Sequence, residues 1–167
     1  EYGNLISIID QNGQVQRFEY ENGLISKIID PNGNITQYKY NFPSVYLTSI
    51  IDTLGNETNY QYDEAGNLIF LKDPLSRQRR YIYDGLDRLL KIIYPDESEL
   101  KLAYDSSSRV IQRINPDGNA IHYEYNTMNR INKKIYPDGS KIKFRYDGVG
   151  NIIEVEDLQG TYRYEYD

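Results

Sequence analysis

Hydrophobic and polar residues alternate along the chain in short runs that recur about every 21 residues. In one such run, Ile142, Phe144 and Tyr146 fall on one side of an extended backbone. Lys143 and Arg145 fall on the opposite side. Alternation with a period of two is typical of a β-strand that has one apolar face and one solvated face. We therefore predict a strand with an aromatic face in every repeat.

A run rich in β-branched residues precedes each alternating run. Short runs of Ile and Val favour strands as well. Two strands per repeat predict about sixteen strands in the chain. The β-branched runs fall at residues 5–9, 24–29, 47–51, 68–71, 89–93, 110–114, 131–135 and 152–155.

A tyrosine near the end of each alternating run defines the repeat. Successive copies are about 20 to 22 residues apart, and such a constant period marks a tandem array. We interpret residues 1–167 as a single array of about eight units. Because the chain opens part-way through a unit, we expect it to be a piece of a longer array. The repeating residues are Tyr20, Tyr40, Tyr62, Tyr83, Tyr104, Tyr125, Tyr146 and Tyr166.

Each β-branched run is followed by a tight turn with the pattern Asp-Pro-Asn-Gly or a variant of it, as at residues 30–33. Pro presets the φ angle of the second turn residue, and Gly accepts the positive φ that a tight reversal requires. Ser76 and Glu97 stand where Gly is expected, and we predict looser or differently closed turns there. The turn glycines are Gly13, Gly33, Gly55, Gly118, Gly139 and Gly160.

A second turn follows the alternating run, and we expect one of its residues to adopt a left-handed backbone. That residue would close a short hairpin, often with a β-bulge. The next residue is arginine in three units, namely Arg88, Arg109 and Arg130. We hypothesise that these arginines pair with Asp84, Asp105 or neighbouring residues and so pin the turns. The left-handed positions are expected at Gly66, Asp87, Ser108, Asn129 and Gly150.

These patterns predict an all-β fold class, built from tandem antiparallel β-hairpins. Twisted open sheets rarely exceed about ten strands without curling, so we expect a curled or spiralling sheet. The alternative fold is a solenoid of parallel rungs, which can have the same repeat length. The tight Pro-Asn-Gly and Pro-Asp-Gly reversals suit hairpins better.

Composition and charge exclude several classes of function. The net charge is −6, which argues against nucleic acid as a partner, because phosphates require a basic surface. No apolar run approaches the length of a membrane span. The chain has no cysteine, so disulfides and thiolate metal sites are excluded. We expect no cofactor.

Candidate catalytic and metal-binding residues are few. Carboxylates are plentiful but recur once per unit at turns, whereas a catalytic pair is normally a unique arrangement. His122 is the only histidine and falls on a wet strand face, without a second His or a Cys to share a metal ion. Asp30 opens a stretch that faintly resembles a calcium loop, but its glycine comes too early for one. We predict no catalytic residue, no metal site and no enzymatic activity.

The repeated aromatic residues allow two interpretations. Packing between strands is favoured, since cross-strand aromatic pairs stabilise sheets. The alternative is a carbohydrate-binding or cell-surface adhesion module, in which exposed rings stack on sugars. The residues for this glycan-stacking alternative are Tyr38, Tyr60, Tyr81, Tyr123 and Tyr164.

The pattern Tyr-x-Tyr-Asp-x-x-Gly-Asn/Arg-Leu, followed by Asp-Pro-x-Gly, resembles the YD repeat, also called the RHS repeat. This repeat occurs in bacterial Rhs proteins, wall-associated repeat proteins, the BC component of Tc toxins and animal teneurins. The resemblance covers the whole chain. In this chain the aspartate that follows the tyrosine is replaced by Glu21, Asn41 and Asn126. The turn aspartate is replaced by Tyr94 and Tyr136.

The resemblance implies β-hairpin strips that spiral into a large hollow shell. In the toxin members, the shell encloses a C-terminal toxin that is released by self-cleavage in a region beyond the repeats. For this chain, the resemblance implies a non-enzymatic structural module that forms part of the shell wall of a large exported bacterial protein. The implied partners are neighbouring YD repeats and an enclosed toxin domain. A secreted or cell-surface location follows from the resemblance alone.

Overall fold

The computed structural model describes residues 3–167, and these residues contain sixteen strands and no helix. The chain divides into two compact units, residues 1–80 and 81–167, and the division falls within a strand. Each unit is described by itself below. The all-β class and the number of strands agree with the prediction from the sequence.

The first unit contains β1 to β7 and the start of β8. The strands are β1 (Ser7–Ile9), β2 (Val15–Glu21), β3 (Leu24–Ile29), β4 (Ile35–Tyr40), β5 (Leu47–Ile51), β6 (Glu57–Tyr62), β7 (Leu68–Lys72) and β8 (Gln78–Tyr83). Each strand pairs antiparallel with the next strand along the chain.

The second unit contains the remainder of β8 and all later strands. These are β9 (Leu89–Ile93), β10 (Glu99–Tyr104), β11 (Val110–Ile114), β12 (Ala120–Tyr125), β13 (Ile131–Ile135), β14 (Lys141–Tyr146), β15 (Ile152–Asp157) and β16 (Gly160–Arg163). From β9 onward each strand again pairs antiparallel with its successor. The tandem hairpin arrangement predicted from the period is therefore confirmed.

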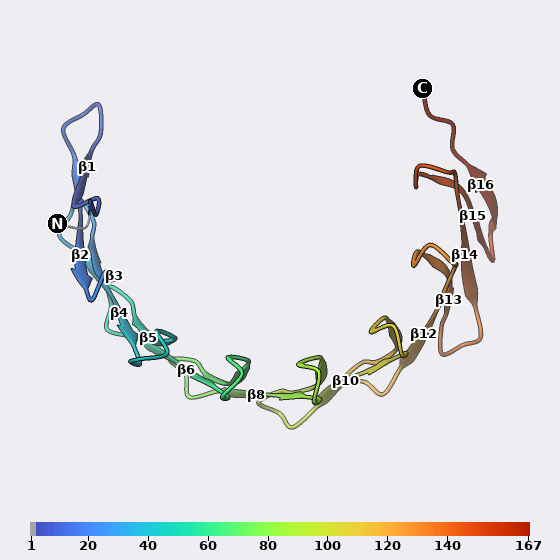
Figure 1. Ribbon diagram of the computed structural model, residues 1–167, viewed down its shortest axis with the longest axis horizontal. Coiled ribbons are helices and arrows are strands. Elements are labelled where there is room, and N and C mark those ends of the chain that lie inside the picture. The colour runs from blue at the N-terminus through green and yellow to red at the C-terminus, as the bar shows by residue number, and fades with distance from the viewer. Residues whose placement is uncertain (1–2) are drawn as a thin grey trace. The chain divides into compact units, whose positions relative to one another are not determined.

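Within each unit the strands form a single layer (Figure 1). Among residues 3–167, the side chains that count as buried are Leu100, with 9% of its surface exposed, and Ser49, with 3%. Neither unit therefore has the hydrophobic core of an ordinary domain, and most side chains within the strands are half-buried between cross-strand neighbours. A sheet of this kind is stabilised by contacts along the strands and at the turns.

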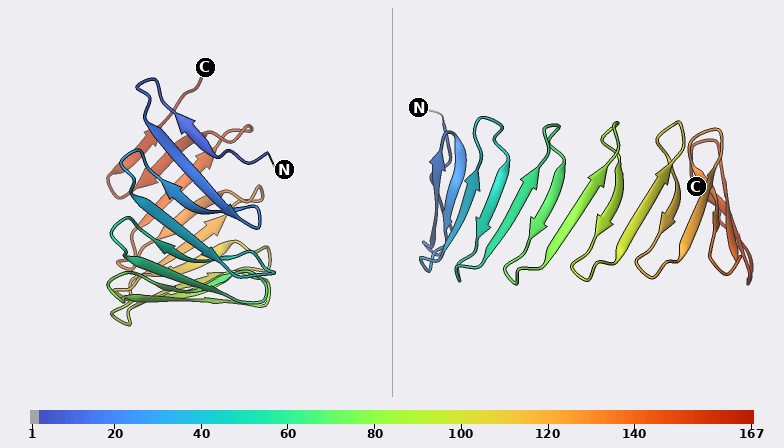
Figure 2. Two further views of the ribbon diagram at one scale, coloured as in Figure 1. Left: turned by 90° about the vertical axis from the view of Figure 1, so that its left-hand side faces the viewer. Right: turned by 90° about the horizontal axis from the view of Figure 1, so that it is seen from below.

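Because the strands form a meander, the two kinds of turn lie on opposite edges of each unit (Figure 2). The turns that follow the β-branched strands lie on one edge, here called the first-turn edge. The turns that follow the alternating strands lie on the other, the second-turn edge. At the second turns, the register shifts by one residue next to the repeating tyrosine, for example between Glu124 and Tyr125. This shift is the predicted β-bulge.

One face of each sheet, here called the apolar face, carries the aromatic residues. In the first unit, register partners on this face are aromatic on one strand and aliphatic on the next, as in Tyr38 opposite Ile50 and Tyr60 opposite Leu71. Cations also enter this face, namely Arg79 opposite Leu71 in the first unit, and Arg113 and Lys134 in the second. The aromatic residues of neighbouring repeats are separated by an aliphatic strand, so the expected ladder alternates in composition.

The opposite face, here called the charged face, carries ion pairs between adjacent strands. Glu124 on β12 pairs with Lys133 on β13 at 2.9 Å, and like-charged register partners such as Lys133 and Lys143 each reach a separate carboxylate. Alternation in β14 places exposed Lys141, Lys143 and Arg145 on this face, as the sequence predicted. The described pairs include Lys27–Glu19, Lys91–Glu99, Lys133–Glu124, Lys143–Glu156 and Arg163–Glu154.

Seven of the eight first turns share one geometry, and the prediction of looser turns at Ser76 and Glu97 is wrong. The eighth, at residues 157–160, closes differently, with a φ of 146° at Gly160. Ser76 and Glu97 adopt the left-handed φ of the turn glycines, 62° and 61°, against 81° at Gly139. Their backbone N–H groups donate to the carbonyls of Asp73 and Tyr94 at 2.9 Å, as the N–H of Gly139 does to Tyr136. The hydrogen bonds of the turn and of the adjoining strands therefore hold an ordinary residue in a conformation that glycine adopts without strain.

Candidate functional site

The second turns are organised by the aspartate that follows the repeating tyrosine. One carboxylate oxygen of Asp105 accepts hydrogen bonds from the backbone N–H groups of Ser107 and Arg109, at 2.9 and 3.0 Å. Asp84 and Asp63 accept the equivalent bonds in their own turns. The left-handed residues expected in these turns are observed, with φ between 58° and 113° at Gly66, Asp87, Ser108, Asn129 and Gly150.

The arginine after the left-handed residue joins its own turn to the next repeat. The Nε of Arg109 donates to the second oxygen of Asp105 at 2.7 Å. Its guanidinium carbon lies 4.7 Å from the centre of the Tyr125 ring, and Nη1 donates to the side chain of Asn129 at 2.9 Å. One side chain therefore contacts the aspartate of one repeat and both the tyrosine and the turn of the following repeat.

The same arrangement occurs at the neighbouring repeats of the second unit. Arg88 pairs with Asp84 at 2.6 Å and lies 4.7 Å from the Tyr104 ring centre. Arg130 lies 5.5 Å from the ring centre of Tyr146 and donates to the carbonyl of Asp147. The hypothesis that these arginines pair with an aspartate and pin the turns is confirmed in geometry for Arg88 and Arg109. Arg130 follows Asn126 and instead bonds the Asp147 carbonyl, and the contact with tyrosine was missed.

The first unit has a tyrosine in place of this arginine. Tyr46 stacks on Tyr62 with ring centres 4.9 Å apart, and its hydroxyl lies against Gly66. Arg130 lies against Gly150 in the corresponding way. Sequence reasoning missed Tyr46 because the insertion at residues 41–45 hides its position. The usable signal was its spacing to the next repeating tyrosine, which equals that of Arg109 to Tyr125.

The repeating tyrosines use their hydroxyl groups to bond the backbone of the neighbouring strand. The hydroxyls of Tyr104 and Tyr125 donate to the carbonyls of Leu89 and Val110, both at 2.8 Å. The same bond is made by Tyr20, Tyr146 and Tyr166, to Leu5, Ile131 and Ile152. Tyr40 and Tyr83 end β4 and β8, and Tyr62 ends β6.

Hydrogen bonds and burial change the pKa values in these turns in opposite directions. The Arg88 guanidinium, through its hydrogen bond, holds the pKa of Asp84 below its usual value. The backbone N–H of Arg109, and then its guanidinium, lower the pKa of Asp105. Loss of hydration raises the pKa of Tyr125, against the opposing charge of Arg109. The turns are therefore built for an ionised aspartate beside a neutral tyrosine.

The first turns use aspartate in a related way and compensate where it is replaced. Asp30 accepts from the N–H groups of Asn32 and Asn34. Where Tyr136 replaces this aspartate, Asp138 two positions later accepts from the N–H of Ser140 instead. The predicted turn glycines Gly13, Gly33, Gly55, Gly118, Gly139 and Gly160 all have positive φ.

The residues proposed for glycan stacking lie on the apolar face without forming a common cleft. Tyr38, Tyr60, Tyr81 and Tyr123 are half-buried among cross-strand neighbours. Tyr164 is 46% exposed, beyond the last strand. Tyr162 and Tyr166, two positions before and after it in the sequence, are exposed as well.

The described part of the chain meets neither the requirements of a metal-ligand cluster nor those of a membrane-spanning helix. No group of three or more His, Asp or Glu side chains is placed to hold a metal ion among residues 3–167. His122 is exposed on β12, and its ring lies 3.4 Å from the Gln112 amide. None of the described residues belongs to a helix that is long and apolar enough to cross a membrane.

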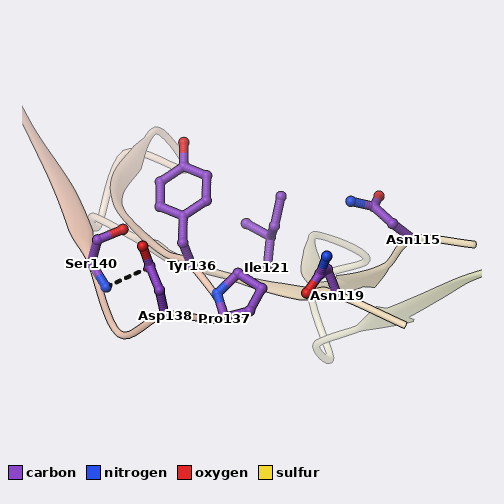
Figure 3. A pocket seen from close by; sticks show the side chains of 7 residues that line it. All are labelled: Asn115, Asn119, Ile121, Tyr136, Pro137, Asp138 and Ser140. Carbon is purple, nitrogen blue, oxygen red and sulfur yellow. Dashed lines mark hydrogen bonds between the residues drawn. The ribbon is translucent and has the colours of Figure 1, made fainter. Parts of the chain in front are cut away.

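Hollows recur along the first-turn edge of the second unit, one between each pair of successive turns. The largest has a volume of about 490 Å³ and lies between the turns at residues 115–119 and 136–140 (Figure 3). Tyr136, Pro137 and Ile121 form its apolar part, with Asn115, Asn119, Asp138 and Ser140 around them. The neighbouring hollows, of about 390 and 300 Å³, repeat this position one unit earlier and one unit later.

The fold and the repeated turn contacts define a tandem β-hairpin repeat protein. Two family models match the chain: Teneurin YD-shell over residues 94–160 and RHS Repeat over residues 1–35. These matches show RHS/YD-type repeats in two segments of the chain, residues 1–35 and 94–160. A comparison with curated protein sequences gives no match.

Several solved structures are similar to the chain in fold. The crystal structure of TcdB2-TccC3 has a TM-score of 0.71 and 17% identity, covering 89% of this chain and 10% of that chain. For TcdB2-TccC3-Cdc42 the TM-score is 0.72, at 16% identity, with 90% and 9% covered. For the Photorhabdus luminescens Tc holotoxin pore it is 0.53, at 13% identity, with 93% and 12% covered.

This chain therefore spans about a tenth of the length of the first similar chains. At these identities the likeness concerns the fold. The family-model matches and the fold together support a structural module of the shell-repeat type.

Proposed function

We propose that the chain forms part of the wall of a YD-repeat shell that encloses a C-terminal toxin or effector domain of a large exported bacterial protein. The main support is the single-layer sheet, which in the first unit has a mainly aromatic and aliphatic face, with Arg79 as a cation on it, and a charged face opposite. A wall needs one surface toward solvent and another toward its contents. No residue of the chain is assigned a catalytic role.

The contacts between repeats also support a mechanical role. Each arginine of the set Arg88, Arg109 and Arg130 contacts the tyrosine of the following repeat. In a repeat array, the total stability is approximately the sum of the intrinsic stability of each repeat and the interaction energy between neighbouring repeats. Contacts that are copied in successive repeats suit a continuous wall, whereas a catalytic centre is a unique arrangement.

The test is protection of the enclosed domain from proteolysis. The longer protein, with its C-terminal region present, is treated with a protease of broad specificity, and cleavage of that region is followed by mass spectrometry. We expect the region to be cut far more slowly than the same region expressed alone. Equal cleavage rates in the two settings would contradict enclosure.

The second candidate function is a carbohydrate-binding or cell-surface adhesion module. The observation in its favour is that the apolar face is uncovered, with Tyr38, Tyr60 and Tyr81 reaching it from alternate strands. Binding on a glycan array that is lost in the Tyr60→Ala and Tyr81→Ala variants would support it. Binding that survives both changes would remove these residues from consideration.

A further inference from the structure

The second-turn edge of the second unit carries exposed apolar side chains at one repeated position. Leu86, Met128 and Val149 are 70%, 62% and 84% exposed. Each stands directly before the left-handed residue of its turn. We call these three side chains the knobs. The remaining turn of this edge has Ser107 at the same position.

The turn itself does not require an apolar residue at this position. The hydrogen bonds that close the turn come from backbone groups and from the aspartate, as in Asp84 accepting from the N–H of Leu86. Turn residues are more often Gly, Asn, Asp or Ser, and Ser107 forms the same turn. Leu, Met and Val therefore expose apolar surface without a local structural reason.

The first-turn edge of the same unit carries the three hollows. Each lies between two successive turns and is lined in part by an apolar or aromatic side chain, such as Pro95, Pro137 or Leu158. Tyr94 and Tyr136 replace the usual turn aspartate there and form part of the lining. These two departures from the repeat pattern thus line hollows instead of disturbing the turns.

Knobs and hollows have the same period because each occurs once per repeat. One repeat contains two strands, so the spacing along either edge is on the order of 10 Å. A row of knobs on one strip can therefore meet a row of hollows on another strip in register over several repeats. Glycines flank two of the three knobs, Gly85 beside Leu86 and Gly148 and Gly150 beside Val149, which leaves the backbone narrow there.

We propose that the second-turn edge of one chain docks on the first-turn edge of a second copy, with the knobs seated in the hollows. Such a contact joins two different surfaces and so propagates side by side without closing. It does not depend on the proposed function, since strips can stack whether or not they enclose a cargo. The matched period favours a second copy over a sugar, because the copy supplies apolar groups at the same interval.

Cysteine cross-linking tests the docking directly, because the chain has no cysteine of its own. Met128→Cys and Ser140→Cys place one thiol on a knob and one beside the largest hollow. We expect the two variants, mixed under mild oxidation, to form at least fivefold more disulfide dimer than either variant alone. Lys143→Cys, on the charged face and about half exposed, is the matched control for Ser140→Cys and should give no such excess.

Three outcomes would overturn the proposal. They are no excess of dimer in the mixture, equal dimer in the Met128→Cys sample alone, or equal dimer with the Lys143→Cys control. Far-ultraviolet circular dichroism of each variant establishes that it is folded, and Val149→Cys with Asn119→Cys provides a second pair.

Sedimentation equilibrium measures self-association independently, and one variant is expected to weaken it while another strengthens it. Replacing all three knobs by serine should weaken self-association at least tenfold. Ser107→Leu adds the missing knob and should strengthen it. A wild-type chain that stays monomeric at every concentration, or a triple variant that associates unchanged, would overturn the proposal. Glycan binding that is lost in Ser140→Trp while association persists would assign the hollows to a sugar instead.

Discussion

The guanidinium carbon of Arg109 lies 4.7 Å from the centre of the Tyr125 ring, in the next repeat along the chain. The same guanidinium pairs with Asp105 of its own repeat. In a sheet with almost no buried side chains, such contacts between repeats replace the missing core. They explain why the tyrosine, the aspartate and the arginine recur together in the sequence.

Replacing Arg109 by alanine is expected to destabilise the protein. The cation–π contact alone contributes about 0.5–1 kcal/mol at a partly exposed site. Arg109→Lys keeps the charge but loses the planar fork, so an intermediate effect is expected. Arg145→Ala is the control, because this side chain is 71% exposed and its ion pair is long, at 3.5 Å. The thermal unfolding midpoint is measured for each variant. Equal midpoints for Arg109→Ala and Arg145→Ala would contradict the account.

Removing the hydroxyl of Tyr125 tests its bond to the backbone. Tyr125→Phe keeps the ring but leaves the Val110 carbonyl without this donor, and a loss of about 0.5–1.5 kcal/mol is expected. Tyr123→Phe is the matched control, since the Tyr123 hydroxyl makes no hydrogen bond to any described residue. Urea unfolding of both variants gives the comparison. The account fails here if the control loses as much stability as Tyr125→Phe.

Acid is expected to destabilise the turns. The side chain of Arg88 lowers the pKa of Asp84, and the side chain of Asn34 lowers the pKa of Asp30, both from a usual value of 3.8. A carboxyl whose folded-state pKa is depressed stabilises the fold above its unfolded pKa. That stability is lost as the pH falls through 3.8 toward the lower folded value.

The measurement is the thermal midpoint at pH 7 and at pH 3. The wild-type midpoint should fall, and Asp84→Asn should show a smaller fall because the side chain no longer titrates. A variant whose midpoint drops as far as that of the wild type would show that this aspartate is not responsible.

The turn at Ser76 is expected to become more stable when glycine replaces serine. A left-handed backbone costs an ordinary residue about 1–2 kcal/mol, and the extra chain entropy of glycine offsets about 0.5–1 kcal/mol of the gain. Gly139→Ala is the reverse change at φ 81° and should lower the thermal midpoint. Opposite signs are the expected result, and a midpoint lowered in both variants would contradict this explanation.

The period and the two alternation patterns predict the strands because both are local properties of the sequence. The structure has strands at Leu24–Ile29 and Val110–Ile114, at the residues that the β-branched runs indicate. The left-handed positions at Asn129 and Gly150 are likewise local preferences of the residue types. Backbone geometry was therefore the most predictable part of the molecule.

The contacts between repeats were less predictable, because they depend on register and on side-chain reach. The salt bridge of Arg109 to Asp105 follows from spacing within one turn, but its contact with Tyr125 requires the position of the following repeat. Tyr46 takes the place of arginine after an insertion, which a fixed pattern does not detect. Ser76 failed as a prediction because the surrounding hydrogen bonds overrule its own preference.

Electron cryomicroscopy of the longer protein, with its C-terminal region present, tests the central claim most directly. The proposal that these repeats form the wall of a container predicts a closed hollow particle with density inside it. An open strip with an empty surface on both sides would contradict enclosure and would give priority to the glycan-array experiment.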